Sequence, residues 1–201
     1  EPKLLVTNST FRGMLTEHGT VLISEIGRDA PESSVLYELT NNTFENNTAY
    51  GAGGGAGIYL INPGRAMLTE NLFQSCTAET GDGGAIKLDC DSFFCAANVS
   101  SNKFEGNSAA TKGGAVSWNR VEPTNVTDNS FTACTATVYG SDIGAVGETI
   151  VPVNQSVYTA NVNTQGDVGP VDVNLAEAGS THTISTASIS GQTSGSAVGT
   201  L

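Results

Sequence analysis

The sequence of 201 residues predicts an all-β fold, a parallel β-helix (solenoid) of about five coils. Three observations lead to this prediction: a six-residue pattern that occurs five times, a glycine-rich pattern that follows it, and a composition rich in Gly, Ser, Thr and Asn. Repeats of roughly 30 residues are typical of solenoids, in which each repeat stacks on the next. The composition favours short strands joined by turns over long amphipathic helices.

The first pattern reads aliphatic, hydroxyl, polar, Asn, any residue, Phe. It occupies residues 6–11, 39–44, 68–73, 99–104 and 126–131, and Ser9 alone interrupts the Asn column. The aliphatic residue and the Phe are five positions apart, so a straight strand would place them on opposite faces. Because both are apolar, we expect the chain to turn between them, at the Asn, which tolerates left-handed backbone. The side-chain amides should then stack in a ladder of Asn42, Asn71, Asn102 and Asn129.

A second pattern continues the repeat. Asn-Thr-Ala and related tripeptides follow at residues 47–49, 76–78, 107–109 and 134–136, and glycine-rich segments follow at residues 55–58, 83–86, 113–116 and 143–146. The aliphatic residue of each glycine-rich segment lies 14, 13, 12 and 15 positions after its Phe. Two columns kept in step by variable spacers predict equivalent places on successive coils. Each coil should contain two or three short strands, paired in parallel with its neighbours at about 4.8 Å.

The combination of Phe-x-x-Asn with Gly-Gly-Ala-Ile resembles the repeat of chlamydial polymorphic membrane proteins, over roughly residues 4–147. The resemblance implies a pectin-lyase-like, right-handed parallel β-helix and a secreted surface passenger that acts in adhesion. Three residues depart from the pattern where the other copies carry Asn: Cys76, Cys134 and Met14.

Two regions are expected, the repeats in residues 1–147 and a β-rich C-terminal extension in residues 148–201. Alternating apolar residues continue at Val171, Val173 and Leu175, but neither column does. Residues 178–201 contain no charged side chain, which favours a paired strand over a solvated tail. We interpret the extension as an assembly strand or a cap.

Charge and hydropathy exclude some partners. Eight basic and twenty acidic residues give a net charge of −12, which disfavours nucleic acid and anionic membranes. No stretch approaches the roughly 20 apolar residues of a membrane-spanning helix, so no membrane insertion is expected. The chain begins at Glu1, and we interpret it as a processed or excerpted segment.

Six Asn-x-Ser/Thr tripeptides predict N-linked glycans, and with them an extracellular or cell-surface location. They begin at Asn8, Asn41, Asn46, Asn98, Asn125 and Asn154. Several occupy matching coil positions: two directly precede the aliphatic column and two follow it. Chance occurrence in a chain rich in Asn, Ser and Thr is the alternative.

Four cysteines allow three pairings. Cys90 and Cys95 close a short loop and are expected to form a disulfide. Cys76 and Cys134 lie in one column two coils apart, about 10 Å, which exceeds the roughly 7 Å reach of a disulfide. Four buried free thiols are the alternative.

The search for catalytic residues yields weak candidates. His18 and His182 lie in no nucleophile motif and are interpreted as surface residues. Polysaccharide cleavage could use an acidic and basic group that is not repeated on adjacent coils, and the same acids could bind Ca²⁺. This group comprises Asp82, Asp89, Asp91, Lys87 and Arg120. We expect no catalytic residue, metal or cofactor.

The leading functional hypothesis is therefore an acidic, glycosylated rod that self-associates into a homo-oligomer or filament through unpaired end strands, or acts as an adhesin. A second hypothesis is a carbohydrate-binding module that binds host or environmental glycans through exposed aromatic residues such as Tyr59 and Trp118, although strand alternation could also turn one of them inward. A polysaccharide lyase or hydrolase is the third.

Overall fold

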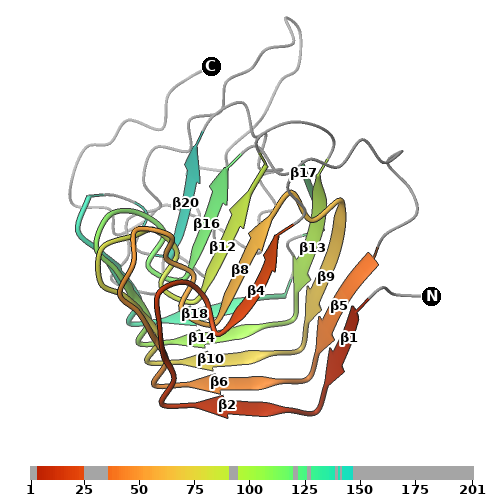
Figure 1. Cartoon of the computed structure of the whole chain (residues 1–201), viewed down its shortest axis with the longest axis horizontal. Helices are drawn as coiled ribbons and strands as arrows, with labels where there is room; N and C mark the ends of the chain where they lie inside the picture. Colours follow the sequence, from red (N-terminus) through yellow and green to blue (C-terminus); the bar gives the residue numbers. More distant parts are fainter. Residues whose placement is uncertain are drawn as a thin grey trace, which may run out of the picture.

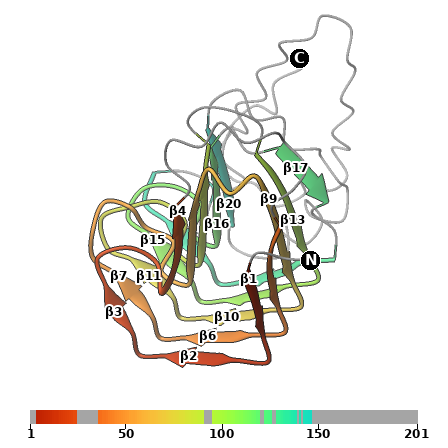
Figure 2. The same ribbon diagram turned by 45° about the vertical axis from the view of Figure 1, so that its right-hand side comes forward.

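Four parallel sheets wrap around a single interior (Figures 1 and 2). The computed structural model describes residues 4–24, 36–90, 95–119, 122–125, 128–138, 140 and 142–146, with side chains left out at 122–125, 145 and 146. The expected C-terminal extension, residues 148–201, lies outside the described residues. No helix occurs among the residues that are described.

Each repeat contributes one strand to each sheet, and we name the sheets A to D in chain order. Sheet A contains β1 (Leu4–Thr7), β5 (Leu36–Thr40), β9 (Arg65–Thr69), β13 (Ala96–Ser100) and β17 (Glu122–Asn125). Sheet B contains β2 (Thr10–Arg12), β6 (Thr43–Glu45), β10 (Leu72–Gln74), β14 (Lys103–Glu105) and β18 (Ser130–Thr132). Sheet C contains β3 (Leu15–Thr16), β7 (Thr48–Ala49), β11 (Thr77–Ala78), β15 (Ser108–Ala109) and β19 (Thr135–Ala136). Sheet D contains β4 (Val21–Ser24), β8 (Ile58–Ile61), β12 (Ile86–Asp89), β16 (Val116–Asn119) and β20 (Ile143–Val146).

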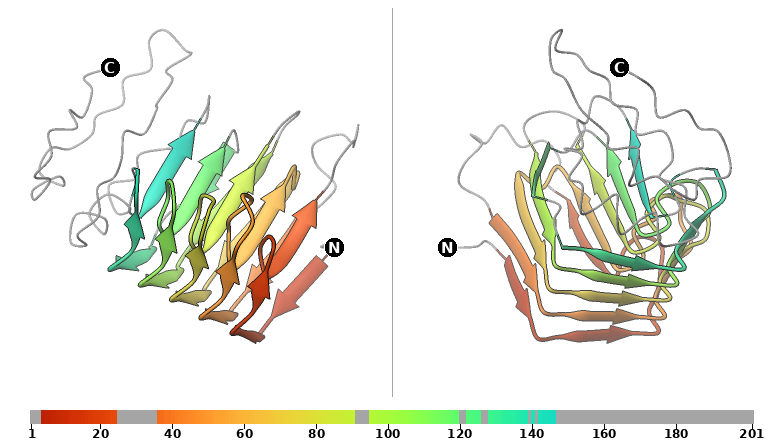
Figure 3. Two further views of the ribbon diagram at one scale, coloured as in Figure 1. Left: turned by 60° about the vertical axis from the view of Figure 1, so that its left-hand side comes forward. Right: turned by 180° about the vertical axis from the view of Figure 1, so that it is seen from behind.

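Equivalent residues of successive repeats lie side by side. In sheet B, Phe73 pairs with Phe44 on one side and with Phe104 on the other. In sheet D, Ile86 lies between Ile58 and Val116. The side view shows the coils stacked (Figure 3), and in sheet D Ile58, Ile86 and Val116 are in the register that the sequence columns predict. In the fifth repeat the predicted position was wrong by three residues: Val116 pairs with Ile143 and not with Val146, because Gly140 takes the left-handed turn position that Gly113 holds in the coil before. The all-β parallel solenoid is confirmed.

Each coil contains four strands, and the expectation of two or three was wrong. The strand that carries Phe and the strand that carries Thr-Ala are separate, because a second corner divides them at Gly13, Asn46, Ser75, Gly106 and Ala133, all with positive φ. The first repeat also has a fourth strand, β4, although it lacks the glycine-rich pattern.

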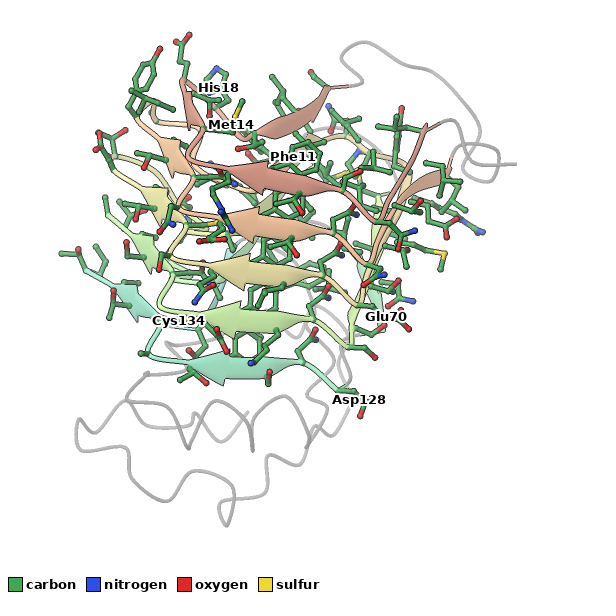
Figure 4. All side chains as sticks on the ribbon, turned by 90° about the horizontal axis from the view of Figure 1, so that it is seen from below. Phe11, Met14, His18, Glu70, Asp128 and Cys134 are labelled. Carbon is green, nitrogen blue, oxygen red and sulfur yellow. A yellow bond between two sulfur atoms is a disulfide. The ribbon has the colours of Figure 1, made fainter. Side chains whose placement is uncertain are left out.

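The left-handed residue of the first corner lies one position earlier than predicted. Positive φ values between 50° and 59° fall on the residue before the Asn column, at Asn8, Asn41, Glu70, Ser101 and Asp128. The prediction that the Asn itself adopts this conformation was wrong because the Asn side chain enters the wall of the coil, where Asn42 is 2% exposed. The preceding side chain points outward, as Glu70 and Asp128 do (Figure 4).

The interior consists of columns of like residues. Five phenylalanines stack with ring centroids 4.9 to 5.1 Å apart, close to the spacing between coils. Aliphatic columns from sheets A and D face this stack, and small alanines line sheet C. Because the rings are held at the same spacing as the strands, one column satisfies both backbone pairing and side-chain packing.

Shortening the central ring should destabilise the protein strongly. We expect Phe73→Ala to lower the free energy of unfolding by about 3–5 kcal/mol, because the ring is fully buried between two others. Gln74→Ala, on the exposed outer face of the same strand, should change it by less than about 0.5 kcal/mol. Urea unfolding followed by circular dichroism measures both, and equal effects would contradict the stacked core.

Candidate functional site

The asparagines of the first corner hydrogen-bond the coil that precedes them. Asn71 Oδ1 accepts the backbone N–H of Asn42 at 3.0 Å, and Asn71 Nδ2 donates to the carbonyl oxygen of Leu39 at 2.8 Å. Asn102 does the same for the N–H of Asn71 and the carbonyl of Leu68. The amides also bond to one another, as in Asn42 Nδ2 to Asn71 Oδ1 at 3.0 Å. We call this column, Asn42, Asn71, Asn102 and Asn129, the first ladder.

A second ladder, which the sequence analysis did not predict, lies at the corner between sheets B and C. Asn47 Oδ1 accepts the N–H of Met14 at 3.0 Å, and Asn47 Nδ2 donates to the carbonyl of Phe11 at 3.1 Å. Asn107 bonds the N–H of Cys76 in the same way. Its members are Asn47, Cys76, Asn107 and Cys134. The sequence signal for this ladder was the Asn or Cys that precedes Thr-Ala or Ser-Ala in each repeat.

The two cysteines of the second ladder replace the amide with sulfur. Cys76 Sγ lies 3.6 Å from the carbonyl oxygen of Phe44 and interacts with the backbone N–H of Asn47. Asn107 Nδ2 lies 3.8 Å from Cys134 Sγ. Burial raises the pKa of the Cys76 thiol to about 12 and that of Cys134 to about 11. Both remain protonated, free thiols at neutral pH.

The predicted disulfide joins Cys90 and Cys95, with their Cα atoms 6.1 Å apart. It closes the loop between β12 and β13 and thereby links sheet D of one coil to sheet A of the next. Asp91, one of the candidate acids, falls within this loop and outside the described residues.

Some of the predicted acidic and basic residues contact one another on the outer face of sheet D. Lys87 Nζ lies 3.5 Å from Asp89 Oδ2 and 3.7 Å from Asp82 Oδ2. Lys112 Nζ lies 3.2 Å from the same oxygen of Asp82. The Tyr59 hydroxyl donates to Asp89 Oδ2 at 2.6 Å, and Lys87 Nζ lies 5.2 Å from the centroid of the Tyr59 ring. We call these five residues the charged cluster.

The charged cluster is built to join coils. Its two lysines and two aspartates sum to no net charge, and the four side chains are between 11% and 20% exposed. They come from strand β12 and from the turns before β12 and β16, and Thr111 also donates to Asp82. Both carboxylates contact lysines, and these ion pairs hold neighbouring coils together. Arg120 lies outside the described residues.

The glycine pattern allows these turns to approach closely. A Cβ atom on Gly84 would lie 2.1 Å from the carbonyl oxygen of Gly114 in the next coil and 2.5 Å from that of Ser108. Any side chain at this position would separate the turns that the charged cluster joins.

The aromatic residues proposed for carbohydrate binding are buried. Trp118 is fully buried in the core, and Tyr59 is 8% exposed beneath the turns of its own coil and its neighbours. The hypothesis that both are exposed was wrong, and the alternative that strand alternation turns one of them inward holds for Trp118. Trp118 occupies the inward column of Leu60 and Leu88, whereas Tyr59 joins the charged cluster. His18 lies beside Tyr59, with ring centroids 6.1 Å apart, and His182 lies outside the described residues.

The glycosylation candidates occupy different environments. Asn8, Asn41 and Asn46 are exposed at corners, each with positive φ. Asn98 is half-buried on the outer face of sheet A, where its Oδ1 accepts a hydrogen bond from Ser100 at 2.7 Å. The side chain of Asn125 and all of Asn154 lie outside the description.

No three His, Cys, Asp or Glu side chains among the described residues converge as a metal site requires. In the same part of the chain, no helix has the length and apolar character needed to span a membrane.

Comparison with known families supports the resemblance. Residues 103–117 match the family model of the Chlamydia polymorphic membrane protein repeat. This segment runs from β14, through β15 and the glycine-rich turn, into β16, and so contains both sequence columns. Neither the curated proteins nor the solved structures yielded a match to the chain. The chain thus carries a repeat of this type on a parallel β-solenoid.

The buried thiols should make the protein less stable in alkali. Their pKa is 9.0 when exposed by unfolding and about 12 and 11 when folded, so above pH 9 the unfolded state binds fewer protons than the folded state. The free energy of unfolding should therefore fall by about 1 kcal/mol per thiol between pH 8 and 10. The double variant Cys76→Ser, Cys134→Ser should lack this part of the fall. Equal pH slopes in urea unfolding would contradict the burial.

Removing the central cation of the charged cluster should destabilise the turns. We expect Lys87→Met to cost about 1–3 kcal/mol, because Asp82 and Asp89 each lose a partner while shielded from water. Lys103→Met, which removes an ion pair whose lysine is 59% exposed, should cost less than about 1 kcal/mol. Thermal unfolding compares the two, and equal losses would show that the cluster contributes no more than a surface pair.

Proposed function

We propose that the chain is a structural segment of a surface protein, a stiff solenoid whose outer face is displayed to the surroundings. The observation that supports this most is the unbroken continuity of the columns. The phenylalanine stack runs through all five repeats, and the first ladder continues across the coils. The match to a polymorphic membrane protein repeat also supports a surface role.

Stiffness follows from the way the coils are joined. Every neighbouring pair of coils shares four strand pairings, ladder hydrogen bonds and stacked rings, so no coil can bend away without breaking all of them. Five coils at about 4.8 Å give a described rod roughly 20 Å long. Uniform interior columns leave the outward residues free to vary, and the proposed display role depends on those residues.

N-linked glycans form the second part of the proposal. Asn8 and Asn41 lie at the same corner of adjacent coils, and Asn41 Nδ2 donates to Asn8 Oδ1 at 2.7 Å. Glycans on both residues would compete for the same space, because the two side chains are only one coil apart. We therefore propose that glycans occupy the exposed corner sites, with at most one of this pair modified in a given molecule.

The exposed location is tested on intact cells of the source organism. Antibodies against the folded chain should label the cells without permeabilisation, and protease added outside should release solenoid fragments. Labelling that appears only after permeabilisation would overturn the surface role.

Glycan occupancy is a separate test. The intact mass of the native protein should fall after enzymatic removal of N-glycans. Asn41→Gln should raise the occupancy of Asn8 in peptide mapping, because the pair no longer competes. A native mass that this treatment leaves unchanged would remove this part of the proposal.

Self-association is the third part. Exposed large apolar residues gather in the first coil, at Leu5, Met14, Leu15 and Leu22. In the following coil the positions of Leu5, Leu15 and Leu22 hold Glu38, Thr48 and Tyr59. We propose that the chain associates with itself through these apolar residues.

A further inference from the structure

We infer that the stacking of the coils controls the reactivity of all four cysteines. None of them reacts while neighbouring coils are in contact, and separation of the coils opens the disulfide to attack by the free thiols. A chain that exchanges its disulfide in this open state cannot restack, so the opening is recorded covalently. Three features lead to this inference: the burial of all four cysteines, the contacts of the free thiols with neighbouring coils, and the separate corners that hold the thiols and the disulfide.

The four cysteines are buried in the wall of the solenoid. Cys76 and Cys134, which carry the free thiols, are 0% and 1% exposed, and Cys90 and Cys95, which form the disulfide, are 2% and 4% exposed. Thiol–disulfide exchange requires a thiolate to attack a disulfide sulfur, so both partners must be accessible to each other. While the coils are stacked, neither an external thiol nor an alkylating reagent reaches these sulfur atoms.

The cover over each free thiol is made by a neighbouring coil. Cys76 Sγ lies 3.6 Å from the carbonyl oxygen of Phe44 in the preceding coil. The backbone N–H of Cys76 donates to Asn107 Oδ1 of the following coil at 2.9 Å. Cys134 Sγ lies 3.8 Å from Asn107 Nδ2 of the coil before it. Because these contacts join different coils, separation of the coils exposes the thiols.

Protonation also keeps the thiols unreactive inside the fold. The thiolate is the nucleophile in exchange, and burial raises the pKa of the Cys76 thiol from 9.0 to about 12. Below pH 9 the folded chain therefore holds about a thousandfold less Cys76 thiolate than the unfolded chain. Separation of the coils removes both barriers, because it exposes the sulfur and restores its ordinary pKa.

The free thiols and the disulfide lie at different corners of the solenoid. Cys76 precedes β11, at the corner between sheets B and C, whereas Cys90 follows β12 and Cys95 precedes β13, between sheets D and A. These two corners are on opposite sides of a coil (Figure 1), and core residues such as Phe73 and Leu88 fill the interior. A disulfide requires Cα atoms within about 7 Å, so Cys76 cannot bond to Cys90 or Cys95 in the stacked chain.

Separated coils permit an exchange that needs no oxidant. Cys76 gives its proton to water, its sulfur attacks Cys90 Sγ, and the bond between Cys90 and Cys95 breaks. Cys95 leaves as a thiolate that takes up a proton, so one disulfide and one thiol are present before and after the step. The new bond joins two corners that lie apart in the stacked coil. Such a chain cannot restack until the exchange is reversed.

The protection of the cysteines is tested on the folded chain with iodoacetamide at pH 8.5, followed by peptide mapping. Cys76 and Cys134 should react at least about a hundredfold more slowly than the exposed thiol of a Val138→Cys variant, and this difference should disappear in concentrated urea. Dithiothreitol should reduce the disulfide in urea and leave it intact in the folded chain. A smaller difference in rate, or reduction without urea, would overturn the inference.

The exchange is tested by the recovery of the fold after unfolding without added thiol. The chain is held in urea at pH 8.5 for increasing times and then diluted, and circular dichroism measures the refolded fraction. The wild type should recover less with time. The double variant Cys76→Ser, Cys134→Ser, which keeps a small donor and acceptor at both ladder positions, should recover fully. At pH 6, where about a thousandth of the exposed thiols are ionised, the wild type should also recover fully.

Peptide mapping identifies the cause of the loss. The unrecovered wild type should contain Cys76 or Cys134 bonded to Cys90 or Cys95. Equal recovery at the two pH values, or a loss of recovery without a new link, would show that the open chain does not exchange its disulfide. This comparison needs the wild type alone, so it decides the question even where the double variant does not fold.

Discussion

The hydrogen bond from a ladder side chain to the backbone of the preceding coil is the interaction on which the solenoid depends. Each corner contains a left-handed residue that interrupts strand pairing and leaves an N–H and a C=O inside the wall. An unsatisfied buried group of this kind costs about 1–3 kcal/mol, and each coil has two such corners. One amide satisfies both groups, because Oδ1 accepts while Nδ2 donates. Glu70, Ser101 and Asp128 adopt positive φ, a backbone conformation that is unfavourable for these residue types. The same hydrogen bonds stabilise it.

Sulfur at two of the corners shows which property of the ladder residue matters. A thiol is a weaker donor and acceptor than an amide, yet Cys76 occupies the same position between Phe44 and Asn47. The requirement is a small side chain that both donates and accepts within the wall. Cysteine also lacks the second donor of asparagine, so the amide chain that runs through the first ladder is interrupted in the second.

The sequence predicts the features that recur and misses those that depend on a neighbour. The phenylalanine column, the parallel register and the Cys90–Cys95 pair follow from spacing alone, because a solenoid places equivalent residues side by side. The left-handed position could not be located this way, since it is held by hydrogen bonds to the next coil and accepts Asn, Glu, Ser or Asp. For Trp118 and Tyr59, strand alternation left open which of the two faces inward; in the structure Trp118 fills the core and Tyr59 lies under a turn. The charged cluster brings Lys112 to Asp82, a contact between turns of different coils that no single repeat reveals.

The ladders also give the solenoid a direction of growth. A coil obtains its corner hydrogen bonds from the repeat that follows it, so a coil formed from the N-terminal side has incomplete corners until the next repeat folds against it. A segment that stacks onto the N-terminal face of a folded coil meets a finished row of side chains already pointing toward it, with the acceptor and donor of each corner in place. Stacking in that direction replaces water on a row of ladder side chains that is already in place. Stacking in the opposite direction requires the ladder side chains and the coil that carries them to become ordered at the same time. Two coils with identical strands are thus unequal as starting points, and the direction of the ladders favours extension toward the N-terminus.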